Sequence, residues 1–162
     1  MKKHQATILL GSNIGDKRIN LSKAIDLLKE NGSSLIKKSS IYESEAWGNE
    51  DQDTFYNQVI VIKTFMPPIF LMKTLLKIER KIGRLRKEKW GPRTIDLDLL
   101  FYDHQVLISN IVTIPHPEIQ NRKFTLIPLV EICPQFIHPV LNQSMTALLS
   151  STQDTLNVKW IK

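Results

Sequence analysis

The chain has 162 residues, of which 42% are hydrophobic and 23% charged, a profile typical of one globular domain with an apolar core. No apolar run approaches the roughly 18 residues that span a membrane or resembles a signal-peptide core, and the single Cys133 forms no internal disulfide, so we expect one cytoplasmic domain over residues 1–162. The net charge of +6 and the pI of about 9.5 favour an anionic partner, either nucleic acid, anionic lipid or a nucleotide.

The first third of the chain alternates strand and helix signals. Residues 6–10 predict a short buried strand. Asp16 is placed to cap a helix that ends at Asn31-Gly32. Residues 34–42 predict a second strand, and the polar stretch 43–53 lacks periodicity and is typical of a loop.

The middle of the chain repeats this alternation. Residues 56–65 form a β-branched run that predicts a strand. Pro67-Pro68 predicts the start of a second helix, which Gly83 closes. Residues 95–102 predict a third long strand.

The last third carries weaker signals. Asp103-His104 predicts a turn into a short hairpin partner over residues 106–108. Residues 122–132 and 144–151 are weakly helical, and 158–161 predict a terminal strand. The order of the elements is the split β-α-β pattern, so the expected class is α+β, a ferredoxin-like antiparallel sheet with helices packed on its faces.

Two carboxylates stand two residues apart on the third long strand. Asp96 and Asp98 therefore leave the same face of it, while Ile95, Leu97, Leu99 and Phe101 are expected on the opposite, core side. A cation between the two carboxylates would relieve their repulsion, and Mg²⁺ prefers such oxygen ligands together with substrate phosphates. The spacing alone is also compatible with a solvated strand face, and the pair suits either one ion or two.

The residues before this strand favour a phosphate site. Gly91-Pro92 places Arg93 directly before the strand, and an arginine suits bidentate contact with phosphate. Trp90 offers a flat face for an aromatic base, and Arg84 and Arg86 follow the end of the second helix, where they are placed to neutralise charge in a transition state. No Walker A motif is present.

Several of these segments together resemble the 6-hydroxymethyl-7,8-dihydropterin pyrophosphokinase family. The resemblance runs from the first strand to about Pro139. The matching residues are Gly11-Ser12-Asn13-Ile14-Gly15-Asp16, Tyr56-Asn57, Gly83-Arg84-Leu85-Arg86, the run from Trp90 to Asp98, Pro115-His116-Pro117 and Arg122-Lys123-Phe124.

The resemblance implies transfer of pyrophosphate from ATP to the hydroxymethyl group of the reduced pterin, with release of AMP, in folate biosynthesis. It implies that Asp96 and Asp98 bind two Mg²⁺ ions, and that these residues act in catalysis together with Arg84 and Arg86. The ATP side would comprise Glu79, Arg84, Arg86, Lys87, Trp90, Arg93, Leu99, Thr113, His116 and Arg122.

On the pterin side the resemblance implies an amide from Asn57 and stacking by Phe55 and Phe124. Backbone groups of Ser44 and Trp47, and Asp96 through its metal, would complete the pocket. Ser44 stands where the family usually has threonine. The expected partners are ATP and the pterin, with no nucleic acid, no membrane and a monomeric chain.

Two other functions compete with this interpretation. Ferredoxin-like sheets also occur in RNA-binding domains, but those carry basic and aromatic residues on the sheet face, where this chain has Asp96 and Asp98. A regulatory nucleotide-binding domain without chemistry would not need the carboxylate pair together with Arg84 and Arg86. The product formed from ATP distinguishes these functions.

Overall fold

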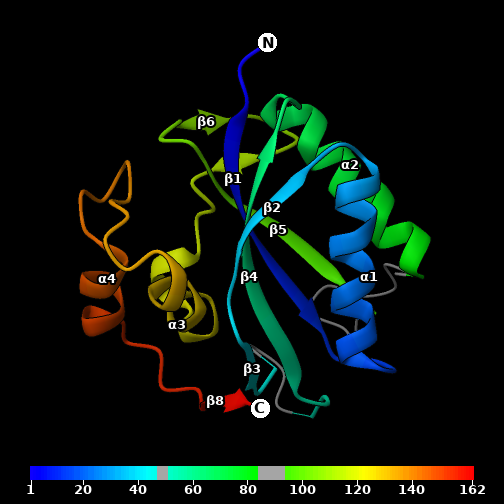
Figure 1. Ribbon diagram of the computed structural model, residues 1–162. Coiled ribbons are helices and arrows are strands. Elements are labelled where there is room, and N and C mark those ends of the chain that lie inside the picture. Colours follow the sequence, from blue (N-terminus) through cyan, green and yellow to red (C-terminus); the bar gives the residue numbers. More distant parts are fainter. Residues whose placement is uncertain (47–50, 84–93) are drawn as a thin grey trace.

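The computed structural model describes residues 1–46, 51–83 and 94–162. Its centre is an antiparallel sheet in the order β5-β1-β4-β3-β8, with β2 also paired to β4 (Figure 1). The order β5-β1-β4 followed by β2 and β3 is that of a ferredoxin-like sheet, as the sequence predicts. The strands are β1 (His4–Ser12), β2 (Ser34–Lys38), β3 (Ile41–Ser44), β4 (Phe55–Thr64), β5 (Asp96–Tyr102) and β8 (Val158–Ile161).

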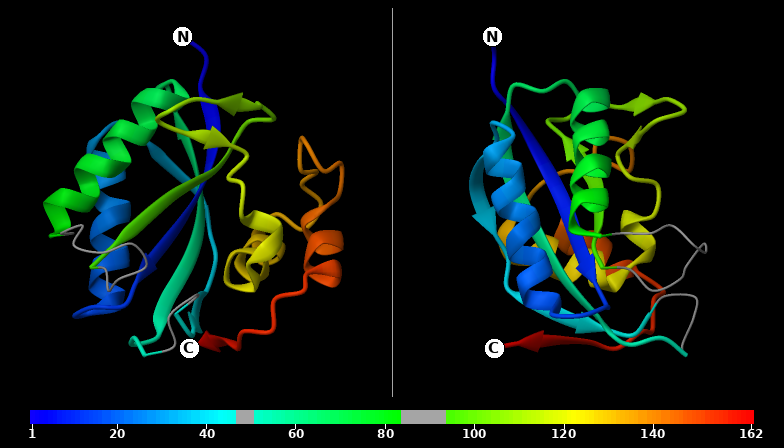
Figure 2. Two further views of the ribbon diagram at one scale, coloured as in Figure 1. Left: turned by 180° about the vertical axis from the view of Figure 1, so that it is seen from behind. Right: turned by 90° about the vertical axis from the view of Figure 1, so that its right-hand side faces the viewer.

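Helices cover both faces of this sheet, as the two turned views in Figure 2 show. Helices α1 (Lys17–Glu30) and α2 (Pro68–Ile82) lie on one face, and α3 (Lys123–Ile132) and α4 (Met145–Ser151) lie on the other. Each face has its own apolar core. The core under α1 and α2 includes Ile8, Leu97 and Leu99, and the core under α3 and α4 includes Leu9, Val59 and Leu100.

The helix ends follow the signals in the sequence. The carboxylate of Asp16 accepts a hydrogen bond from the Ile19 amide at 3.0 Å and so caps α1. Gly83 ends α2 with a left-handed backbone at φ +108, a conformation that favours glycine. Of the described residues, none belongs to a helix with the length and apolar character needed to cross a bilayer.

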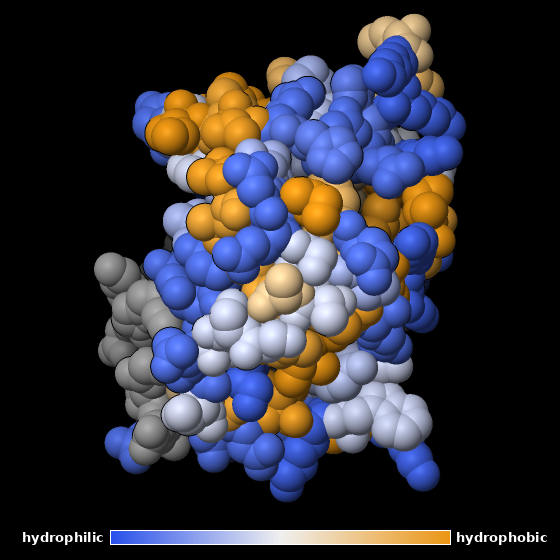
Figure 3. Space-filling view, turned by 90° about the vertical axis from the view of Figure 1, so that its left-hand side faces the viewer, coloured by the Kyte–Doolittle hydropathy of each residue, from blue (hydrophilic) through white to orange (hydrophobic). Residues whose placement is uncertain are grey.

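Two strand predictions are wrong in detail. The single strand expected over 34–42 is two strands, because the chain leaves the ladder at Ser39 and Ser40, whose amides bond to the Val59 carbonyl and the Glu131 carboxylate. Asp103 does form a turn, but the strand after it, β6 (Leu107–Ile108), pairs with β7 (Thr113–Ile114) rather than with β5. The hairpin of β6 and β7 carries exposed apolar side chains at the upper left of Figure 3.

A bulge in β5 overturns one expectation about its faces. Ile8 pairs with Leu99 and the preceding Thr7 pairs with Phe101, so Leu100 is an extra residue in the ladder. Leu97 and Leu99 therefore lie in the α1/α2 core, whereas Phe101 lies in the α3/α4 core. The prediction that Phe101 shares a face with Leu97 and Leu99 is wrong, because strict alternation stops at the bulge.

Candidate active site

A row of register partners crosses four strands at one end of the sheet. Tyr42 in β3 pairs with Asn57 in β4, Asn57 with Gly11 in β1, and Gly11 with Asp96 in β5. Side chains of register partners leave the same face of a sheet. An amide and a carboxylate thus share one face, and between them stands a residue that has no side chain.

The two carboxylates of β5 share this face. Asp96 and Asp98 are half-buried, while Leu97 between them is fully buried in the α1/α2 core. Asp98 pairs with Leu9, which lies in the α3/α4 core. The carboxylates therefore face the α3 side of the sheet.

Glu79 of α2 holds β5 from the opposite side. The residue is 2% exposed, and its Oε1 accepts a hydrogen bond from the Leu97 amide at 2.8 Å. Because β5 is the edge of the sheet, this bond gives the Leu97 N–H a partner in a buried setting. Glu79 thus fixes the backbone between the two aspartates.

His116 is fixed next to β5. Its amide donates to the Leu100 carbonyl at 2.9 Å, and its Nδ1 accepts from the Glu118 amide at 3.2 Å. Burial, and then the charge of Arg122, lower the pKa of His116 to about 4. At neutral pH the ring is therefore uncharged and carries its proton on Nε2, where it is a hydrogen-bond donor.

Arg122 and Phe124 stand at the beginning of α3. Arg122 is the N-cap residue of this helix, and its guanidinium carbon lies 5.7 Å from the centre of the Phe124 ring. Helix α3 packs on β3 and β4, the strands that carry Ser44, Phe55 and Asn57. Phe55 and Phe124 are both half-buried.

The amide of Asn57 is held by two partners in β3. Its Nδ2 donates to Ser44 Oγ at 2.8 Å and to the Tyr42 carbonyl at 3.3 Å. A Cβ on Gly11 would lie 3.6 Å from Phe55 Cδ1 and 3.7 Å from Asn57 Oδ1. Phe55, Gly11 and Asn57 are therefore immediate neighbours.

The remaining predicted site residues differ in where they lie. The side chain of Leu99 lies in the α1/α2 core, so only its main chain is available to a ligand on the carboxylate face. Thr113 is half-buried in β7. The following predicted site residues lie outside the described part of the chain: Trp47, Arg84, Arg86, Lys87, Trp90 and Arg93.

Two residues that shape the site, Gly11 and Ser44 through its hydroxyl, are not predicted from the sequence. The sequence pattern assigns Gly11 no role in the site, although a glycine inside a strand signals a close approach or a gap. The hydroxyl of Ser44 gave no signal, because its partner Asn57 is thirteen residues away along the chain.

The pair Asp96 and Asp98 suits a hard cation. Within residues 1–46, 51–83 and 94–162, no group of three or more His, Cys, Asp or Glu side chains could hold a metal by itself. Mg²⁺ does not require such a cage, because it keeps several waters and shares carboxylates with substrate phosphates. The donor set therefore fits Mg²⁺ bound together with a polyphosphate.

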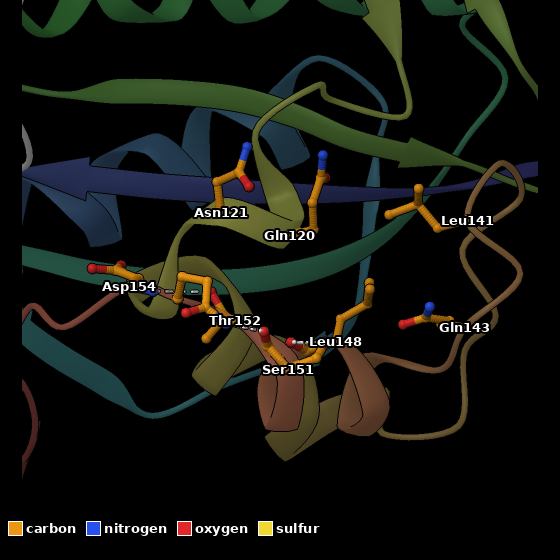
Figure 4. A pocket seen from close by; sticks show the side chains of 9 residues that line it. Gln120, Asn121, Leu141, Gln143, Leu148, Ser151, Thr152 and Asp154 are labelled. Atoms are coloured by element: carbon orange, nitrogen blue, oxygen red, sulfur yellow. Dashed lines mark hydrogen bonds between the residues drawn. The ribbon is translucent and has the colours of Figure 1, made fainter.

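A separate cavity of about 460 Å³ lies between the 3₁₀ turn η1 (Ile119–Asn121) and the end of α4 (Figure 4). Amide and hydroxyl side chains line most of it, with Leu141 and Leu148 as its apolar part. None of the residues predicted for the active site lines it. It is therefore distinct from the carboxylate site.

The fold and this site define an α+β protein with a ferredoxin-like sheet, an acidic pair on its edge strand and a fixed amide two strands away. The sequence profile of the family described as 7,8-dihydro-6-hydroxymethylpterin-pyrophosphokinase (HPPK) matches residues 7–134. The chain belongs to this family.

Curated relatives agree with the profile. The chain is 41% identical over 136 residues to the 2-amino-4-hydroxy-6-hydroxymethyldihydropteridine pyrophosphokinase of Aquifex aeolicus. These residues make up 84% of this chain and 84% of that one. It is 43% identical over 131 residues to the enzyme of that name from Bacillus subtilis, covering 80% of this chain and 78% of that one.

A solved structure agrees on the fold. Plasmodium falciparum HPPK-DHPS with pteroate superposes with a TM-score of 0.73 over 92% of this chain at 18% identity. The present chain spans 42% of that longer chain. At this level of identity the likeness concerns the fold alone.

Proposed function

We propose that the chain transfers pyrophosphate from ATP to the hydroxymethyl group of 6-hydroxymethyl-7,8-dihydropterin in folate biosynthesis. The hydroxymethyl oxygen forms a bond to the β-phosphorus of ATP, the bond from that phosphorus to the α,β-bridging oxygen breaks, and AMP leaves. The hydroxyl proton is released. The products are AMP and the pterin diphosphate.

One structural observation supports this proposal in addition to family membership. The row Asn57, Gly11 and Asp96 puts an amide for a flat heterocycle and a carboxylate for metal-bound phosphate on one face of the sheet. A transfer between two substrates depends mainly on holding them in the right relative position. This row supplies that arrangement on three adjacent strands.

Asp96 and Asp98 would hold Mg²⁺, two ions when ATP is bound. When bound, these ions would neutralise charge on the phosphates. The protein's own groups orient the substrates: the neutral His116 offers an N–H donor, and Arg122 offers a positive charge beside it. Glu79 keeps the two aspartates in register through the Leu97 amide.

The decisive experiment is an incubation of the purified protein with ATP, MgCl₂ and the reduced pterin, followed by nucleotide separation. AMP should form in proportion to the pterin consumed, and EDTA should stop the reaction. ADP as the nucleotide product, or AMP formation without pterin, would overturn the proposal.

Oligomeric state and location remain predictions from the sequence. We propose a cytoplasmic monomer of 18.7 kDa. Light scattering after size exclusion tests the mass, and elution at twice that mass would contradict it. Fractionation of the source cells tests the location.

A further inference from the structure

The hydrogen bond between Ser44 and Asn57 is buried. Each of the two residues is 2% exposed, and Nδ2 of Asn57 lies 2.8 Å from Ser44 Oγ. Water does not compete for a buried hydrogen bond, so this bond holds the amide in one orientation.

The chemistry of the partners decides which way the amide points. The second partner of Nδ2 is the Tyr42 carbonyl at 3.3 Å, and a carbonyl oxygen only accepts. Turning the amide over would bring two acceptors, Asn57 Oδ1 and the Tyr42 oxygen, against each other. The nitrogen therefore faces β3, and Oδ1 faces away from it.

Oδ1 points into the part of the site nearest the carboxylates. It lies 3.7 Å from the position that a Cβ on Gly11 would take, and Gly11 pairs directly with Asp96. An acceptor at this place suits a ligand edge that offers an N–H group. The curated relatives are named for a 2-amino-4-hydroxy-pteridine, a ring that carries such donors on one edge.

We infer that the side chain of Ser44 is a positioning residue for pterin specificity, because its hydroxyl holds the Asn57 amide with Oδ1 toward the ring edge. This inference rests on the proposed function and deepens it. It gives the serine side chain a role in addition to that of its backbone.

The first test compares Ser44→Ala with Ser44→Thr. Without the hydroxyl the amide keeps only its longer bond to Tyr42, and we expect the KM for pterin to rise about five- to twentyfold. The kcat and the KM for ATP should stay within about twofold, and Ser44→Thr should restore the pterin KM. An unchanged KM in Ser44→Ala, or an equal loss in Ser44→Thr, would overturn the inference.

A double-mutant cycle separates positioning from folding. If Ser44 acts through the amide, Ser44→Ala should add less than about a twofold loss of pterin affinity to Asn57→Ala, measured by calorimetry. An equal loss in both backgrounds would contradict the inference. Where Asn57→Ala binds too weakly to measure, the comparison of Ser44→Ala with Ser44→Thr decides.

Two controls keep the results unambiguous. Melting curves check that each variant folds, and Ser44→Cys, which fills the same space with a weak acceptor, replaces Ser44→Ala if that variant does not. If the wild-type protein forms no AMP, the proposed function fails. If it forms AMP and Ser44→Ala is indistinguishable from it, only the role of Ser44 fails.

Discussion

At the scale of single residues, Gly11 matters through the side chain that it lacks. It stands between Asn57 and Asp96, and a methyl group there would meet Phe55 and Asn57 at ordinary contact distances of 3.6 and 3.7 Å. The backbone of Gly11 is not among those with positive φ, so alanine fits it without strain.

Gly11→Ala should therefore separate stability from binding. We expect an unchanged or slightly higher melting temperature, because alanine lowers the entropy of the unfolded chain. The added methyl should raise the KM for pterin about tenfold, the usual effect of one extra carbon in a fitted pocket. Gly32→Ala is the matched control. Gly32 has a φ of +84, which strains an alanine, so this variant should destabilise the protein and leave the pterin KM unchanged.

His116 predicts a dependence of stability on pH. The pKa of its ring is about 4 in the folded protein, against an ordinary value of 6.5, mainly because of burial. As the pH falls below 6.5 the unfolded chain takes up the proton first, so stability falls between about pH 6.5 and 4. The loss should be about 1–3 kcal/mol.

Urea unfolding at pH 7.5 and pH 5, without ATP or metal, measures this loss. His116→Gln, which cannot take up the proton, should show a smaller drop between the two pH values. Identical drops in the two proteins would show that His116 is not the group responsible.

At the scale of elements, one carboxylate connects α2 to β5. The Leu97 amide lies on the edge strand and has Glu79 Oε1 as its acceptor at 2.8 Å. Without an acceptor this buried N–H would destabilise the protein by about 1–3 kcal/mol. Because Leu97 lies between the two aspartates, their spacing depends on this contact.

Glu79→Gln and Glu79→Leu test this role as a matched pair. Glutamine keeps an oxygen acceptor and should retain most of the stability and the affinity for Mg-ATP. Leucine fills a similar volume without an acceptor, so we expect a lower urea midpoint and weaker Mg-ATP binding, measured by calorimetry. Equal behaviour of the two variants would argue that the bond to Leu97 does not position the carboxylates.

The elements also show where sequence reasoning stops. The periodicity of Leu71, Leu75 and Ile78 and the cap residues Asp16 and Gly83 sufficed to predict α1 and α2, because these signals are local. The bulge at Leu100 and the pairing of β6 with β7 depend on partners distant along the chain, and nothing local signals them.

The same limit applies to the site. The spacing of Asp96 and Asp98 on a strand predicted their common face correctly. The neutral ring of His116 and the orientation of the Asn57 amide were not predictable, because both follow from burial and from contacts between distant segments. The roles of the arginines at 84, 86 and 93 stay predictions, since these residues lie outside the described part of the chain.

At the scale of the whole molecule, the end of the chain supports the site. Strand β8 pairs with β3 along its length, with Val158 opposite Ser44 and Trp160 opposite Tyr42. The match to the family profile ends at residue 134, so β8 lies beyond it. The strand that orients Asn57 thus has its outer edge covered by a segment outside the matched region.

Removal of residues 155–162 should therefore affect one substrate more than the other. Both apolar cores lie elsewhere, so the shortened chain should fold, with a lower melting temperature. The KM for pterin should rise while the KM for ATP changes little. A proportional loss of both would mean that β8 supports the fold in general and not the pterin side.

The extra residue Leu100 divides β5 into two segments. In the first segment the even-numbered side chains face α3 and α4, and in the second the odd-numbered ones do. Before Leu100 the strand directs Asp96 and Asp98 outward and Leu97 and Leu99 into one core, and after it Phe101 enters the other core. Deletion of Leu100 would merge the two patterns. The acids, Phe101 and Tyr102 would keep the faces that they have now, because Leu99 and Phe101 already pair with the consecutive residues Ile8 and Thr7. The deletion should therefore leave the chain folded with a lower melting temperature, because it removes the buried Leu100 side chain from the α3/α4 core. A relative with a gap at this position would therefore carry its acidic pair on the same face, with a regular strand in place of the bulge.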